Sequence, residues 1–212
     1  MLLSSRGDGQ MIHSLANRVA SVFVAYGESS EENADIYAYA AEAIIAFLVN
    51  LAICLMIAFV FGRLLEGLVF ILGFAVLRRH TGGYHANTHL KCILTFNCIV
   101  LCTMAILTVS VWGGFSGLMS IVIATLSVTG IFAAKVIERV LKISNETITR
   151  KLSKSGVGVV VGFWLFCVVA FYINNSQIGL VLALSMFFVF GSVAYAIYIN
   201  AVSYSTARGG DE

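Results

Sequence analysis

The sequence predicts an all-α, polytopic membrane protein with about six transmembrane helices and an N-terminal interfacial amphipathic helix. The first observation is composition: 59% of the 212 residues are hydrophobic and only 11% are charged, whereas a soluble domain has about 25% charged residues. The second is that the apolar residues form long runs separated by short polar connectors. We therefore expect a single integral membrane domain over residues 1–212.

Residues 10–27 predict the amphipathic helix. Apolar side chains recur there at helical spacing, and polar side chains take the other face. The apolar positions are Ile12, Leu15, Val19, Val22, Phe23 and Tyr26. Gly27 can end this helix. A helix of this kind lies in the membrane interface.

Six apolar runs follow, and about 20 such residues are needed to cross ~30 Å of hydrocarbon. The predicted spans are residues 43–62, 64–77, 90–112, 115–134, 157–173 and 178–198. Residues 35–42 are expected to continue the first helix on the wet side. The second run is short and contains Glu66, so whether it crosses fully stays open. Because proline is absent, breaks between helices depend on glycine or polar side chains.

Charge predicts the orientation, because Lys and Arg near span ends favour the cytoplasmic side. With a cytoplasmic N-terminus, all of the 13 basic residues except Arg63 fall inside. Residues 135–154 carry six of them, and we expect a basic cytoplasmic loop that contacts anionic lipid headgroups. Capture of an acidic peptide tail is the alternative. The net charge of +2, spread between apolar runs, gives no indication of nucleic acid.

One cytoplasmic stretch, "RRHTGGYHANTHLKC" at residues 78–92, gathers reactive side chains. Its Cys92 lies about one turn into a helix that Asn87 or Thr88 can cap. A thiol near a helix N-terminus and near cations is readily deprotonated and becomes a nucleophile. The other cysteines lie inside apolar runs and are interpreted as packing residues: Cys54, Cys98, Cys102 and Cys167.

Two histidines compete as the acid and base for this thiol. His89 lies three residues before Cys92 on the same helix face. His85 lies in the preceding loop and reaches the thiol only if the chain turns sharply, which Gly82 and Gly83 permit. From the residues alone this choice stays open.

A third group that orients the histidine is not evident in the stretch. Asn87 and Asn97 are the candidates. For Asn97 the alternative role is a hydrogen bond between helices within the membrane.

Other classes of function are weighed against this one. A metal-dependent peptidase would use His80, His85 and His89, with Cys92 as a fourth ligand. The stretch has no carboxylate to act as a base, and its cations repel a metal ion, so we expect no metal and no cofactor. A transporter would place more polar groups at mid-membrane than Asn50 and Asn97. A non-catalytic scaffold would tolerate Cys92→Ala.

The spacing R-x4-G-x-H-x6-C, formed by Arg78, Gly83, His85 and Cys92, resembles the accessory gene regulator B (AgrB) family. These proteins are membrane-embedded cysteine endopeptidases of bacterial quorum sensing. The chain's length, its amphipathic N-terminus and its six-span layout are similar along the whole sequence. Only residues 78–92 carry the motif itself.

The resemblance implies an activity, its residues and its partners. An AgrD-like precursor peptide is cut on the C-terminal side of its pheromone segment, which is then closed into a ring, usually a thiolactone. Cys92 would be the nucleophile and His85 its base and acid, and Arg78 and Gly83 would be the further residues that activity requires. His89 lies outside the pattern. The enzyme would be a homodimer in the bilayer of the bacterial cytoplasmic membrane, with its active site on the cytoplasmic side.

Overall fold

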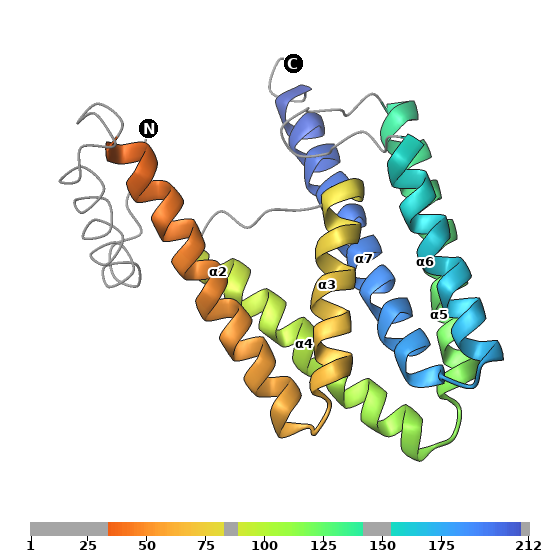
Figure 1. Ribbon diagram of the computed structural model, residues 1–212. Helices are drawn as coiled ribbons and strands as arrows, with labels where there is room; N and C mark the ends of the chain where they lie inside the picture. The colour runs from red at the N-terminus through yellow and green to blue at the C-terminus, as the bar shows by residue number, and fades with distance from the viewer. Residues whose placement is uncertain (1–33, 83–88, 142–153, 209–212) are drawn as a thin grey trace. The chain divides into compact units, whose positions relative to one another are not determined.

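The computed structural model describes residues 34–82, 89–141 and 154–208 (Figure 1). The predicted amphipathic helix at residues 10–27 lies outside this part of the chain. The described residues form six helices and no strand. These are α2 (Ala34–Val60), α3 (Leu64–Thr81), α4 (His89–Trp112), α5 (Ser116–Leu141), α6 (Lys154–Tyr172) and α7 (Ser176–Arg208). The predicted all-α class is confirmed for these residues.

Each predicted span lies on a helix of its own, and α5 and α7 extend furthest beyond the C-terminal ends of their apolar runs. Helix α5 continues to Leu141, so the first residues of the predicted loop 135–154 are helical. Helix α7 continues to Arg208. Residues 135–141, "KVIERVL", contain neither glycine nor proline, and their Lys, Glu, Arg and Leu are good helix formers. The end of an apolar run therefore does not end the helix.

Three of the turns between helices share one hydrogen-bond pattern. Each has one residue in the left-handed region, namely Gly62 (φ 65°), Gly114 (φ 69°) and Asn174 (φ 57°). In the first turn, the Gly62 amide donates to the Phe59 carbonyl at 2.8 Å and the Arg63 amide donates to the Ala58 carbonyl at 2.9 Å. This is the Schellman motif, which satisfies the last carbonyls of a helix. The predicted connectors "FGR", "GG" and "NNSQ" are thus confirmed as turns.

Among the described helices, three contain a segment long and apolar enough to cross a membrane. The segments are Lys91–Trp112, Ser116–Ile137 and Ser176–Val202. Two shorter apolar helical segments are Ile44–Val60 and Gly156–Tyr172. These helices indicate a membrane protein. The full set of six crossings stays a prediction.

Chain contacts divide the molecule into two units. The described residues of the first unit are 34–56 and 89–98, and the second comprises 57–82, 99–141 and 154–208. In the second unit, α7 packs against α3, α5 and α6. Every residue of α7 from 179 to 186 is buried, as expected of a helix surrounded by other helices. The prediction of a single peptidase domain stays a prediction.

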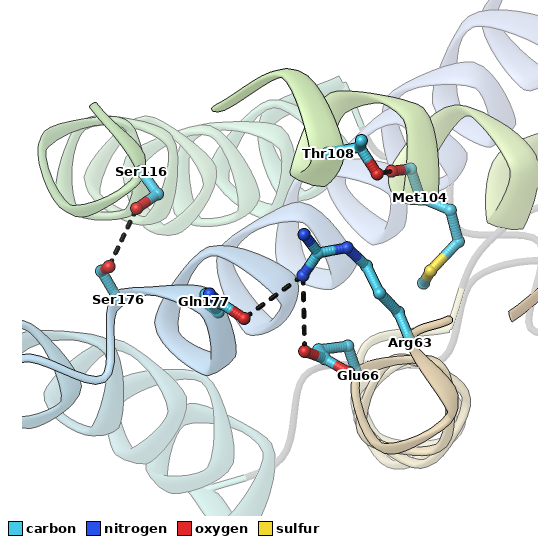
Figure 2. A network of polar contacts seen from close by, with 7 residues as sticks. All are labelled: Arg63, Glu66, Met104, Thr108, Ser116, Ser176 and Gln177. Atoms are coloured by element: carbon cyan, nitrogen blue, oxygen red, sulfur yellow. Dashed lines mark hydrogen bonds and ion pairs between the residues drawn. The ribbon is translucent and has the colours of Figure 1, made fainter. Parts of the chain in front are cut away.

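Polar contacts join the N-terminal ends of three helices in the second unit (Figure 2). Arg63 Nη1 donates to Gln177 Oε1 at 3.2 Å and lies 3.5 Å from Glu66 Oε1. Ser116 Oγ and Ser176 Oγ are 2.8 Å apart. Helices α3, α5 and α7 therefore begin at the same end of the unit and run parallel. Glu66, whose charge left the crossing of α3 open, has a cationic partner there.

Candidate functional site

The predicted nucleophile lies at the start of α4. Cys92 is in the first turn, three residues after His89, and its side chain is partly exposed. This turn contains no acidic residue, and Lys91 beside Cys92 is exposed. The positive end of the helix dipole and a neighbouring ammonium group both favour negative charge at this position. The first turn of α4 can therefore present an accessible sulfur in an electropositive setting.

The other cysteines fall into two groups. Cys54 and Cys167 are buried, which confirms their interpretation as packing residues. Cys167 Sγ donates to the Gly179 carbonyl at 3.4 Å and links α6 to α7. Cys98 and Cys102 are exposed on α4, so their interpretation as packing residues was wrong. An apolar run predicts a span, but it does not predict which face of the span turns outward.

Arg78 lies in the last turn of α3, together with Arg79 and His80. Basic side chains at this end of a helix interact favourably with its dipole. Arg78 Cζ lies 5.8 Å from the centroid of the Phe74 ring, within the range of a cation–π interaction. Phe74 is itself buried, so it provides a fixed surface for the guanidinium group.

The chain leaves α3 through a backbone conformation that only glycine adopts readily. Gly82 has φ 75° and ψ −156°, a region closed to residues with a Cβ atom. Its amide donates to the Arg78 carbonyl at 3.0 Å. The buried Thr81 hydroxyl donates to the Leu77 carbonyl at 2.9 Å. Gly82 thus ends α3 in a conformation that glycine permits, while the predicted sharp turn of the glycine pair stays a prediction, because Gly83 lies outside the described residues.

The remaining motif residues, Gly83 and His85, lie outside the described residues, and so does the side chain of His89. Arg78 belongs to the second unit and Cys92 to the first. The choice between His85 and His89 stays a prediction.

No group of three or more metal-binding side chains occurs among the residues that the structure describes. The side chains of His85 and His89 are not part of that set. The metal-dependent alternative therefore remains for experiment.

Asn97, a candidate to orient the histidine, is bonded within the first unit. Its Nδ2 donates to Asn50 Oδ1 and to the Ile93 carbonyl, both at 2.8 Å, and its Oδ1 accepts from Cys54 Sγ at 3.3 Å. The alternative expectation for Asn97, a hydrogen bond between helices, is confirmed. Sequence reasoning missed Cys54 as a partner. The signal was present in the four-residue spacing of Asn50 and Cys54, which places both on one helix face.

The fold and the site together define a class of protein: an all-α membrane protein with an accessible cysteine at the start of an apolar helix. Comparison with protein families matches Accessory gene regulator B over residues 16–197, and the chain belongs to this family. No curated protein and no solved structure matches the chain. The predicted family is confirmed. AgrB proteins take part in the processing of quorum-sensing propeptides and act with the AgrD propeptide.

Proposed function

We propose that this protein is a membrane-embedded cysteine endopeptidase that cleaves its AgrD-like propeptide and promotes cyclisation of the pheromone segment. The single observation that carries the proposal is the position of Cys92. Cys92 is a partly exposed residue in the first turn of an apolar helix, and it is the last residue of the R-x4-G-x-H-x6-C pattern.

The first half-reaction forms a thioester and releases a peptide tail. His85 takes the proton of the Cys92 thiol, and the sulfur attacks the carbonyl at the C-terminal end of the pheromone segment. The peptide C–N bond then breaks, and His85 gives the proton to the leaving amine. The products are an acyl-enzyme thioester on Cys92 and the free C-terminal tail.

The second half-reaction transfers the acyl group within the peptide. A thiol in the pheromone segment attacks the thioester and forms the thiolactone ring. The bond between the acyl carbon and Cys92 Sγ breaks, and Cys92 regains a proton as the attacking thiol loses one. One thioester replaces another, so the exchange is nearly isoenergetic and needs no ATP. Exclusion of water from the acyl-enzyme favours ring closure over hydrolysis.

Arg78 and Gly83 have supporting roles in this proposal. The Arg78 guanidinium group binds the oxyanion that develops on the scissile carbonyl, or a carboxylate of the substrate. The buried Phe74 ring below Arg78 supports this role, because it restricts the positions that the guanidinium group can take. Gly83 allows the substrate backbone to approach closely.

The proposed topology has six crossings, with the reactive stretch on the cytoplasmic side. Helix α3 runs parallel to α7, which contains a full-length apolar segment, and this packing supports a crossing by α3 as well. Arg63 and Arg78 then lie at opposite ends of α3. The basic residues of 135–154 contact anionic lipid headgroups on the cytoplasmic face. The family resemblance leads us to propose a homodimer.

The test uses the purified full-length protein in liposomes with its propeptide and reads the products by mass spectrometry. We expect wild-type protein to release the C-terminal tail and Cys92→Ala to release none. Cys98→Ala, which removes an exposed cysteine from the same helix, is the matched control and should keep wild-type activity. Tail release by Cys92→Ala at the wild-type rate would contradict the proposal. Loss of wild-type activity to a chelator would favour the metal-dependent alternative instead.

A further inference from the structure

A cluster of polar side chains joins α2 to α4 within the first unit. Its centre is Asn97, whose Nδ2 donates to Asn50 Oδ1 at 2.8 Å and whose Oδ1 accepts from Cys54 Sγ at 3.3 Å. The Asn97 Nδ2 also donates to the Ile93 carbonyl of its own helix at 2.8 Å. An asparagine amide offers two N–H donors and one carbonyl oxygen. Every polar atom of the Asn97 side chain thus has a partner.

On α2 the cluster lies on a narrow stripe of small side chains. Ala46, Asn50 and Cys54 recur every four residues, and Ala46 and Cys54 are only 6% and 0% exposed. Five large side chains of this part of α2 are between 42% and 62% exposed, namely Ile44, Phe47, Leu48, Val49 and Met56, whereas Ile45, Leu51, Ile53 and Leu55 are half-buried. The fully buried positions of this part of α2 thus hold small side chains, which offer little interlocking shape to set its orientation. The hydrogen bond between Asn50 and Asn97 adds a directional contact between the two helices.

On α4 the cluster lies on a different side from the nucleophile. Asn97 and Ile93 are one turn apart and share a face. Cys92 precedes Asn97 by five residues, which at about 100° per residue separates the two side chains by roughly 140° around the helix. The contact with α2 therefore leaves the face of Cys92 uncovered, in agreement with its partial exposure.

We propose that Asn50 and Asn97 are positioning residues of the enzyme: their hydrogen bond holds α2 against the side of α4 turned away from Cys92 and thereby fixes the rotation and depth of the helix that carries the nucleophile. The proposal rests on the proposed function. It adds a helix, α2, and two residues that lie outside the R-x4-G-x-H-x6-C pattern. Polar side chains are costly within a membrane helix, and the positioning role accounts for the presence of Asn50 and Asn97 in two apolar helices.

The expected effect of breaking the bond is on the rate of the chemical step. An interhelical hydrogen bond in a membrane protein changes an equilibrium by about threefold to twentyfold. A displacement of about 1 Å at a reacting group lowers a rate by up to about 100-fold. We therefore expect Asn50→Leu and Asn97→Leu to lower kcat for tail release by roughly tenfold. KM for the propeptide should change by less than about twofold, because the substituted residues lie away from the thiol.

The experiment measures kcat and KM for the two single variants and the double variant in liposomes. Because both residues act through one bond, the double variant should be no slower than the slower single variant. Asn50→Asp keeps the Oδ1 acceptor that Asn97 uses and should retain most activity. Thr108→Val is the matched control, because it removes a hydroxyl of α4 that donates to the Met104 carbonyl of the same helix, and it should have wild-type kcat.

Two further readouts separate positioning from a loss of folding. The rate at which a thiol reagent labels Cys92, followed by peptide mass spectrometry, should change in the leucine variants and stay at the wild-type value in Thr108→Val. Unfolding temperatures should stay near that of Thr108→Val. Wild-type kcat in both leucine variants would overturn the inference, and so would losses that add in the double variant or that follow the unfolding temperature. Failure of the proposed function itself would be seen separately, as tail release by Cys92→Ala.

Discussion

A single side chain, the Cys92 thiol, carries the proposed chemistry, and its location distinguishes it from the other cysteines. Cys54 and Cys167 are buried and donate hydrogen bonds within the protein. Cys98 and Cys102 are exposed but lie further along the apolar segment of α4. Cys92 alone lies in a first turn, beside Lys91 and close to the end of the apolar segment. A nucleophile that attacks a peptide needs this access to the membrane surface.

The partner of this thiol is the first prediction at the residue scale. If the loop histidine is the base, His85→Ala should abolish tail release and slow the alkylation of Cys92 at neutral pH. His89→Ala should keep most activity, because a residue outside the motif is not needed for proton transfer. Product analysis and a labelling time course measure both effects. The reverse pattern would assign the role to His89.

The end of α3 is the element on which the reactive stretch depends most directly. Arg78 occupies its last turn, the buried Thr81 hydroxyl satisfies the Leu77 carbonyl, and Gly82 turns the chain out of the helix. A residue with a Cβ atom at φ 75° and ψ −156° is strained. The conformation of Gly82 therefore determines where the chain continues toward the remaining motif residues.

Gly82→Ala should for this reason lower both stability and activity. We expect a loss of about 1–3 kcal/mol in the free energy of unfolding, together with a clear fall in tail release. Gly158→Ala on α6 is the control, because an added Cβ there meets no atom within 4 Å and alanine is favoured over glycine in a helix by about 1 kcal/mol. Thermal unfolding and product analysis of both variants check this. Equal stability and activity of the two variants would show that the Gly82 conformation has no such importance.

For the molecule as a whole, hydropathy predicted where the helices lie, but it did not predict which helix packs against other helices and which faces outward. Apolar runs and the short connectors between them, such as "FGR", located the described helices closely. The extension of α5 to Leu141 was missed, because hydropathy reports transfer into lipid and not the propensity to remain helical. The central position of α7 was missed as well, since an apolar residue suits the protein core and the lipid equally.

The candidate site was proposed from residues that are local in sequence. Arg78, Gly83, His85 and Cys92 lie within fifteen residues, so their spacing alone suggested a chemistry. The bond between Asn50 and Asn97 joins residues 47 positions apart, and no spacing rule links two different helices. The sequence singled out both residues as polar side chains within apolar runs, but their pairing required the fold.

The most direct test of the central claim is the intact mass of the enzyme after incubation with a propeptide whose ring-closing cysteine is replaced by alanine. The Cys92 sulfur can still attack this peptide, but the acyl group then has no internal thiol to receive it. We predict a covalent adduct on Cys92 that hydroxylamine removes, or its slow hydrolysis to a linear acid, whereas the native propeptide yields a cyclic product and little adduct. Stoichiometric release of the tail with no adduct at any time, unaffected by prior alkylation of Cys92, would remove Cys92 from the mechanism.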